Sequence, residues 1–171
     1  MTEDEFKFGD GQPDDFLNNP FGDKPEDSVP EDGEEHEVRV VGVYEHRVRE
    51  EDHQSEFVVL VRDDKDRTVL IVIGRFEAMA ISLALEGHAA DRPLTHDLLN
   101  NVINKLGGSV SRILIDDLWN GTYYAKVTIL SKGTEFVIDS RPSDAIALAL
   151  RAKSPIYMAE HILRAVGLKE E

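Results

Sequence analysis

The sequence predicts an α+β domain that contains a duplicated unit of three strands and two helices, with the two halves sharing one core. Strand-like runs occur in two groups of three, and two helical segments follow each group. The apolar residues 80–86 align with residues 145–151 at an offset of 65, and the later helices align at an offset of 60. A barrel-like mixed sheet with the helices packed outside it is one form that this shared core could take.

The net charge of −15 is concentrated at the amino terminus. Residues 1–37 carry 14 acidic residues against Lys7 and Lys24, a net charge of −12, and residues 38–171 retain only −3. We expect residues 1–37 to form a disordered acidic tail, because their few apolar side chains cannot offset the entropy of ordering. The alternative is that the acidic side chains occupy a basic cleft in place of nucleic acid.

The remaining residues, 38–171, are enough for one domain with its own core. The absence of cysteine excludes a disulfide framework and thiolate chemistry. The amino terminus lacks an apolar signal segment, and the longest apolar run, residues 69–73, is too short to cross a bilayer. We therefore expect a cytoplasmic protein without a membrane partner. Its nearly balanced domain lacks the broad positive field of a protein that holds DNA by charge alone.

The first half of the duplication is expected to span about residues 38–107. Strands are predicted at residues 38–45, 57–61 and 68–73, with a turn at 63–66; the third strand is apolar on both faces and should be central. A helix follows at residues 75–86 and ends before Gly87. Thr95 is the expected cap of the next helix, which ends at Gly107-Gly108.

The second half is expected to span about residues 108–171. Strands are predicted at residues 110–116, 122–130 and 135–138, and Asn120-Gly121 indicates a two-residue hairpin between the first two. Pro142 pre-sets the backbone for the first turn of a helix, with Ser140 as its expected cap. Ser154-Pro155 ends that helix, and a last helix is predicted at residues 158–166.

Residues 139–144 form the polar corner around which the rest of the chain is organised. The helix that follows them is apolar on nearly every face and must be buried. Its amino end therefore brings two carboxylates, two hydroxyls and a guanidinium to one place, where a strand ends and a buried helix begins. This arrangement favours a functional site.

Three motifs in this order resemble the bifunctional nuclease domain family, over about residues 38–167. They are Gly74 with Glu77-Ala78, then Arg92-Pro93-Leu94-Thr95-His96-Asp97-Leu98, then Asp139-Ser140-Arg141-Pro142-Ser143-Asp144-Ala145-Ile146-Ala147-Leu148. The resemblance implies a nuclease that hydrolyses phosphodiester bonds in both RNA and DNA, with nucleic acid as its substrate.

The same residues suggest how such a reaction could proceed. Asp139 and Asp144 could share a Mg²⁺ or Mn²⁺ ion, since these ions prefer carboxylate oxygen, and Asp97 and Glu77 could supplement them. His96 is the candidate general acid or base. The expected substrate-binding residues offer guanidinium forks or hydroxyls, and they are Arg92, Thr95, Ser140, Arg141, Ser143 and Arg151.

Structural roles explain many of these residues equally well. Ser140, Ser143 and Asp144 suit the first turn of a helix, and Arg141 and Arg92 could pair with Asp144 and Asp97 to brace the two corners. The alternative to a nuclease is therefore a non-catalytic module that binds an anionic ligand or a protein partner at the Arg-Pro corners. A homodimer is the further partner state that we consider.

Overall fold

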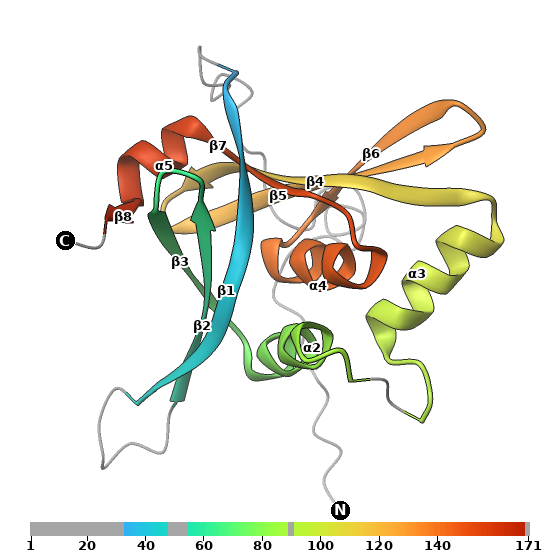
Figure 1. Cartoon of the computed structure of the whole chain (residues 1–171), viewed down its shortest axis with the longest axis horizontal. Coiled ribbons are helices and arrows are strands. Elements are labelled where there is room, and N and C mark those ends of the chain that lie inside the picture. The colour runs from blue at the N-terminus through green and yellow to red at the C-terminus, as the bar shows by residue number, and fades with distance from the viewer. Residues whose placement is uncertain (1–32, 48–54, 89–90, 170–171) are drawn as a thin grey trace, which may run out of the picture. The chain divides into compact units, whose positions relative to one another are not determined.

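The computed structural model describes residues 33–47, 55–88 and 91–169. The predicted tail, residues 1–37, therefore lies mostly outside the described residues. Figure 1 labels the helices, which are α2 (Arg75–Leu85), α3 (Thr95–Lys105), α4 (Pro142–Ala152) and α5 (Glu160–Val166). It also labels the strands, which are β1 (Glu35–Arg47), β2 (Ser55–Asp63), β3 (Arg67–Ile73), β4 (Gly108–Trp119), β5 (Thr122–Ser131), β6 (Thr134–Ser140), β7 (Ile156–Ala159) and β8 (Leu168–Lys169).

All of these strands join one mixed sheet in the order β6-β5-β4-β7-β1-β2-β3-β8. The first three strands form one antiparallel meander and the strands β4 to β6 form another. The short strand β7 connects the two meanders, because it pairs antiparallel with β1 and parallel with β4. The α+β class is confirmed. Among the described residues the sheet stays open, with β6 and β8 at its edges, so the barrel is not confirmed.

Two tight turns set the register of the second meander. Asn120 and Gly121 have φ angles of 47° and 78°, which is the backbone that the predicted Asn-Gly hairpin requires. Lys132 and Gly133 have φ angles of 50° and 79° and make a second two-residue turn between β5 and β6. Because the turns are so short, each fixes which residues of its two strands lie opposite one another.

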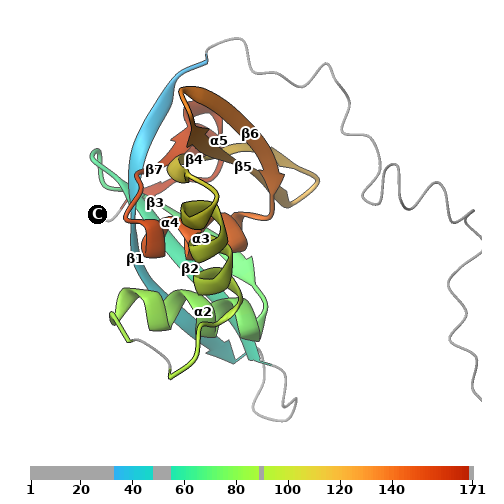
Figure 2. The same cartoon turned by 90° about the vertical axis from the view of Figure 1, so that its right-hand side faces the viewer.

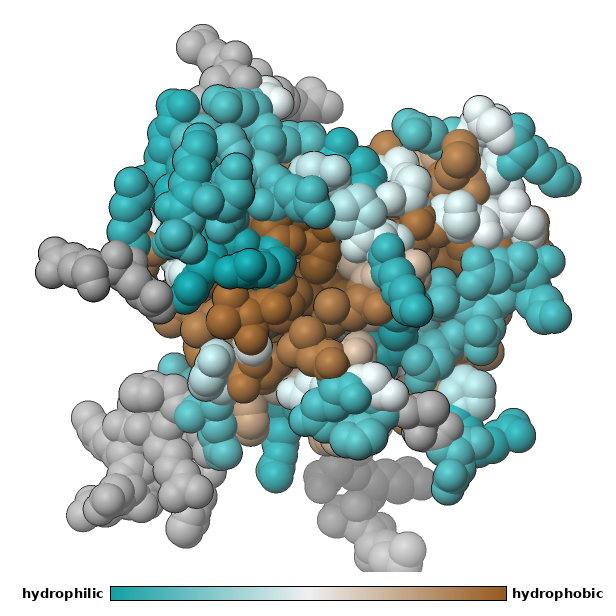
Figure 3. Space-filling model, in the orientation of Figure 1, coloured by the Kyte–Doolittle hydropathy of each residue, from teal (hydrophilic) through white to brown (hydrophobic). Residues whose placement is uncertain are grey.

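The helix α4 lies at the centre of the core, as its sequence predicts. Seven of its residues are buried, and it contacts α2, α3, β4 and β5 (Figures 1 and 2). Ile81 of α2 and Ile146 of α4, which the proposed duplication aligns, are both fully buried. Each half places a helix after three antiparallel strands. This shared order does not by itself show a duplication, which remains a prediction. Apolar side chains of this core are visible over β1 and α4 at the centre of Figure 3.

Three sequence expectations about elements need correction. Residues 156–159 form strand β7, so the last helix begins at Glu160 and not near residue 158. β3 is not central, because only the two-residue β8 lies beyond it, and Leu70 and Val72 are exposed. β1 begins at Glu35, so the folded part includes residues that the sequence assigned to the tail.

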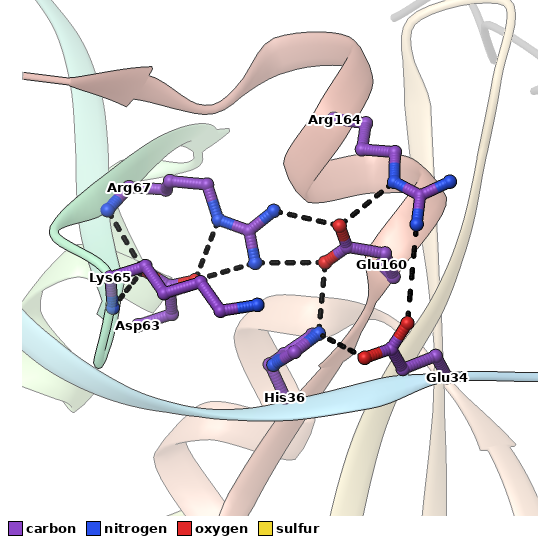
Figure 4. A network of polar contacts seen from close by, with 7 residues as sticks. All are labelled: Glu34, His36, Asp63, Lys65, Arg67, Glu160 and Arg164. Atoms are coloured by element: carbon purple, nitrogen blue, oxygen red, sulfur yellow. Dashed lines mark hydrogen bonds and ion pairs between the residues drawn. The ribbon is translucent and has the colours of Figure 1, made fainter.

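A buried ion cluster, which we call the Arg67 clasp, ties three distant segments together (Figure 4). Arg67 Nε donates to Asp63 Oδ2 at 2.7 Å, and its terminal nitrogens donate to both oxygens of Glu160, at 3.0 and 2.8 Å. Arg164 Nε donates to Glu160 at 2.8 Å. His36 Nε2 lies 2.9 Å from the same carboxylate without the geometry of a hydrogen bond. The clasp thus connects the start of β1, the β2–β3 turn and α5.

The charges of the clasp stabilise one another. The hydrogen bonds from Arg67 lower the pKa of Glu160 to about 2, although burial opposes its ionisation. Burial also opposes ionisation of Asp63, but the hydrogen bonds from Arg67 outweigh it and lower the pKa of Asp63. Both carboxylates are therefore charged at neutral pH, and Arg67 holds two negative charges in the protein interior.

Candidate functional site

The polar corner forms where β6 ends and α4 begins. Arg141 is the N-cap residue in an extended conformation, and Pro142 occupies the first helical position, as the sequence predicts. The prediction that Ser140 caps the helix is wrong. Ser140 pairs with Ala125 as the last residue of β6, and its hydroxyl donates to the carbonyl of Arg141 at 3.0 Å. No capping side chain therefore accepts a hydrogen bond from the backbone N–H groups in the first turn of α4.

Arg141 joins two carboxylates from different helices. Its Nε donates to Asp144 Oδ2 at 2.7 Å, and its Nη1 lies 3.0 Å from Glu77 Oε1 in the first turn of α2. The hydrogen bond to Asp144 raises the pKa of Arg141 above its usual value, although burial opposes this shift. The side chain of Arg141 is nevertheless 64% exposed, so its guanidinium can still meet a ligand from solution.

His96 completes this group from the first turn of α3. Its Nε2 lies 3.0 Å from Asp144 Oδ1. The hydrogen bond with His96 lowers the pKa of Asp144 to about 2, burial opposes the shift, and Arg141 adds to it. An ionised carboxylate can only accept hydrogen bonds, so the proton of this contact must be on Nε2 of His96. The neutral ring then offers its Nδ1 lone pair for a proton.

A second ion pair fixes α3 beside α4. Arg151 Nε donates to Asp97 Oδ1 at 2.6 Å, and its Nη1 donates to the carbonyls of Ala147 at 2.8 Å and Ala80 at 3.1 Å. The side chain of Arg151 is only 9% exposed. Arg151 therefore links α2, α3 and α4 from inside and does not present its guanidinium to solvent.

Asp97 also sets the start of α3. Its Oδ2 accepts the backbone N–H of Leu94 at 2.9 Å, and Leu94, not Thr95, is the N-cap residue. Thr95 is the first residue of the helix and is exposed. Burial opposes ionisation of Asp97, but the bonds from Leu94 and Arg151 outweigh it and lower the pKa of Asp97. The side chain of Asp97 is thus engaged in positioning the turn that carries His96.

Asp139 and Asp144, the expected ligands of one metal ion, engage different partners. Lys126 Nζ donates to Asp139 Oδ1 at 3.1 Å on the exposed face of β5 and β6. Both oxygens of Asp144 contact His96 and Arg141. Within residues 33–47, 55–88 and 91–169, no group of three or more His, Asp or Glu side chains is arranged to hold a metal ion.

A cleft of about 350 Å³ opens beside Arg141. Its polar side is formed by Arg141, Glu77 and the buried Ser143, and its apolar side by β3 and the β4–β5 turn. The lining residues are Leu70, Ile71, Val72, Ile73, Gly74, Glu77, Gly121, Thr122, Tyr123, Arg141, Pro142 and Ser143. The remaining candidate, Arg92, is exposed in the loop before α3.

Gly74, the residue before α2, leaves room for the side chain of Glu77. A Cβ atom at Gly74 would lie 2.2 Å from Oε2 of Glu77, which folds back over it. Gly74 therefore leaves the space in which the Glu77 carboxylate lies when it contacts Arg141.

Sequence reasoning expected these residues near one corner but missed some of their partners. The corner holds Glu77, His96, Arg141 and Asp144 in one network, with Asp97 and Arg151 in the neighbouring one. The contact of Lys126 with Asp139 was missed. Its signal is the Lys132-Gly133 turn, which places these two residues opposite each other across the β5–β6 hairpin.

Sequence comparisons relate this chain to known proteins. A profile of the bifunctional nuclease domain matches residues 58–171, which is two thirds of the chain. An uncharacterized protein of Mycobacterium tuberculosis is 43% identical over 133 residues, which cover 77% of this chain and 76% of that protein. Bifunctional nuclease 1 of Oryza sativa subsp. japonica is 25% identical over 126 residues, 72% of this chain and 38% of the relative. Bifunctional nuclease 2 of Arabidopsis thaliana is 22% identical over 118 residues, 67% of this chain and 36% of the relative.

None of the described helices is long and apolar enough to cross a membrane. The bifunctional nuclease domain profile covers two thirds of the chain and includes all three motifs, and this chain belongs to the bifunctional nuclease domain family.

Proposed function

We propose that this protein is a nuclease that hydrolyses phosphodiester bonds of DNA and RNA at the polar corner of α4. The observation that carries the proposal is the His96–Asp144–Arg141–Glu77 network at the edge of the cleft. It combines a histidine held by an ionised carboxylate with a guanidinium that is open to solvent. These are the groups that proton transfer and phosphate binding require.

Each residue of the network has a role in this proposal. His96 Nδ1 takes a proton from water as the water oxygen attacks phosphorus, and Asp144 orients the ring and stabilises the imidazolium that forms. The bond from phosphorus to the leaving oxygen then breaks, and that oxygen takes a proton from the imidazolium or from solvent. Water is the nucleophile because DNA lacks the 2′-hydroxyl that RNA could use.

Arg141 is the proposed phosphate ligand. Its fork can bind two phosphoryl oxygens, and the first turn of α4 adds N–H groups that favour an anion. Glu77 holds the guanidinium at the edge of the cleft, and Asp97 and Arg151 position the turn that carries His96. In this proposal Asp97 and Arg151 are positioning residues and do not touch the substrate.

A divalent ion is a separate part of the proposal. Asp139 and Asp144 would hold Mg²⁺ or Mn²⁺, and the ion would supply positive charge for the phosphoryl oxygens. Among the described residues these carboxylates contact Lys126, His96 and Arg141, so an ion would have to displace these partners. Activity measured with Mg²⁺, with Mn²⁺ and with chelator, in the wild type and in Asp139→Asn, tests this part separately.

The experiment that tests the function compares two histidine variants. We expect His96→Asn to lower hydrolysis of single-stranded DNA and RNA by about 10²–10⁴-fold, the usual contribution of a general base. His88→Asn is the matched control, because His88 is an exposed histidine outside this network whose side chain contacts Glu86. Equal activity in His96→Asn and His88→Asn, purified in the same way, would contradict the assignment and indicate a contaminating nuclease.

The alternative function is binding of an anionic ligand or a protein partner without catalysis. The exposed guanidinium of Arg141 supports it, because a cation that is open to solvent can bind an anion without any group that transfers a proton. Fluorescence titration with a labelled oligonucleotide, followed by analysis of its length, separates the two functions. Binding that Arg141→Ala abolishes, with an oligonucleotide that stays intact, would support the binding module and contradict the nuclease.

A further inference from the structure

The helix α3 exposes an apolar stripe that nothing in its own chain covers among the described residues. Leu98, Val102 and Leu106 recur at four-residue spacing and therefore lie on one side of the helix. All three are exposed, and Leu106 is 74% exposed, whereas Ile103 is the buried residue of this helix. A helix that buries one side chain and exposes such a stripe is covered on one flank only.

The edge strand β6 exposes apolar side chains beside this stripe. Among the described residues β6 pairs only with β5, and Phe136 and Ile138, which lie on the same face of the sheet as Ile129, are both about half exposed. Long apolar edge strands are uncommon in monomers, because they associate with other chains. Lys and Pro, which commonly protect an edge, do not occur within β6.

α3 and β6 form the two walls of one groove. The groove has a volume of about 510 Å³, and its lining residues are Ile103, Leu106, Gly108, Ile129, Ser131, Glu135, Phe136, Val137 and Ile138. Figure 2 shows α3 and β6 on the same side of the domain, and apolar atoms also gather at the β5–β6 hairpin in the upper right of Figure 3. We call the five exposed residues Leu98, Val102, Leu106, Phe136 and Ile138 the α3–β6 surface.

We propose that a second copy of this chain covers the α3–β6 surface, so that the protein is a two-fold symmetric dimer. Five apolar side chains that are about half exposed offer on the order of 500 Å². A homodimer interface is about 65% apolar, so this area corresponds to roughly 800 Å² per copy with its polar rim, the size of a stable interface. The surface therefore has the extent that a dimer needs.

The shape of the surface also suits a second copy. A two-fold interface brings the same patch of both chains together, so the patch must be complementary to itself. The α3–β6 surface contains both a protruding row of side chains and a groove of matching chemistry. The stripe of one α3 can enter the groove of the other chain, and the reverse contact forms at the same time.

The test is the mass of the full-length protein in solution, measured by light scattering and sedimentation velocity from about 1 to about 100 µM. We expect about 38 kDa, twice the 19.2 kDa of one chain. Leu106→Glu and Phe136→Glu should each weaken the dimer at least about 100-fold, because the symmetric contact buries two unpaired carboxylates. Both positions are exposed, so circular dichroism should show an unchanged fold.

Phe76→Glu is the matched control, since Phe76 is 82% exposed on α2 outside the α3–β6 surface. This variant should keep the mass of the dimer. A monomeric wild type at about 100 µM would overturn the proposal. So would a dimer that survives both Leu106→Glu and Phe136→Glu, or one that only Phe76→Glu dissociates, because the second copy would then bind elsewhere.

Discussion

At the scale of single residues, the candidate site depends on which charges pair and which stay open. Arg141 contacts Glu77 and Asp144 yet remains largely exposed, whereas Arg151 makes a comparable ion pair and is enclosed by three helices. The sequence treats both arginines as substrate ligands, and only their surroundings in the fold separate them. A guanidinium that must release a partner to bind phosphate needs that exposure.

Gly74 allows the role of Glu77 to be tested without changing a charge. In Gly74→Ala the new Cβ atom must displace the Glu77 carboxylate, which can move because it ends a flexible side chain. We expect the free energy of unfolding to change by less than about 1 kcal/mol. We expect kcat to fall several-fold, because Arg141 loses its support on α2.

The comparison variant for this prediction is Glu77→Gln, which keeps the shape and removes the charge. Both variants should affect kcat in the same direction, measured with a single-stranded oligonucleotide under steady-state conditions. Wild-type kinetics in both would show that Glu77 does not position Arg141.

Arg141→Ala separates phosphate binding in the ground state from binding in the transition state. We expect it to lower kcat more than it raises KM, because charge on the phosphoryl oxygens is redistributed as the bond breaks. Steady-state kinetics and a thermal unfolding curve measure both effects. A large drop in unfolding midpoint with unchanged kinetics would instead show that the Arg141–Asp144 pair braces the corner.

At the scale of secondary structure elements, the sequence predicted the features that depend on neighbouring residues in the chain. The Asn120-Gly121 turn, the start of α4 at Pro142 and the burial of α4 follow from neighbouring residues, and the structure confirms them. Strand β7 could not be found in this way. Its residues fill a position between β1 and β4, and only those distant strands make residues 156–159 extended.

The same limit applies to the site. The sequence placed Asp139 and Asp144 at one corner, because only four residues lie between them across a strand end and a helix start. It could not show that His96, 48 residues away, would contact Asp144, and the contact of Lys126 with Asp139 requires the register that the Lys132-Gly133 turn sets. Those contacts depend on how α3 packs on α4 and on the β5–β6 register.

The Arg67 clasp makes the packing of these elements sensitive to one buried charge. In Arg67→Met, Asp63 and Glu160 would remain buried without their cation, and we expect the free energy of unfolding to fall by about 3–5 kcal/mol. Arg164→Ala is the control, because Arg164 approaches the same carboxylate from an exposed position and should cost at most about 1 kcal/mol. Urea denaturation measures both. Equal losses would show that Arg67 is not the central charge of the clasp.

The clasp also predicts how stability depends on acid. The pKa of Glu160 is about 2 in the folded protein and 4.5 as its ordinary value. Its contribution to stability is therefore complete above pH 4.5 and is lost as the pH falls toward 2. Unfolding midpoints of wild type and Glu160→Gln should differ most above pH 5 and converge at low pH, within about one pH unit of this window. A constant difference across the range would contradict the shift.

At the scale of the whole molecule, the described domain begins earlier than the sequence suggested. Glu35 to Glu37 pair with β7, and the carbonyl of Glu34 accepts the backbone N–H of Glu160 at 2.9 Å. The sequence ended its tail at residue 37 because the acidic composition continues to that point. Charge composition therefore marks the boundary less well than strand pairing does.

Two truncations test this boundary. Removal of residues 1–32 should change the midpoint of thermal unfolding by no more than a few degrees, since no described contact is lost. Removal of residues 1–37 also deletes His36 and the start of β1, and should lower the midpoint by roughly 5–10 °C. Calorimetry of both proteins measures the two midpoints of thermal unfolding. Equal midpoints would show that β1 effectively begins after residue 37.

The position of β7 has a consequence for how the chain is made. The two meanders are neighbours in one sheet only because this four-residue strand lies between β1 and β4. A nascent chain that has reached residue 155 contains both meanders but not the strand that joins them. Its apolar surfaces stay exposed until β7 has been synthesised. Such a late, long-range contact slows folding and makes the chain prone to aggregation. Chaperones that shield unfinished chains should therefore matter more for this fold than its modest size suggests.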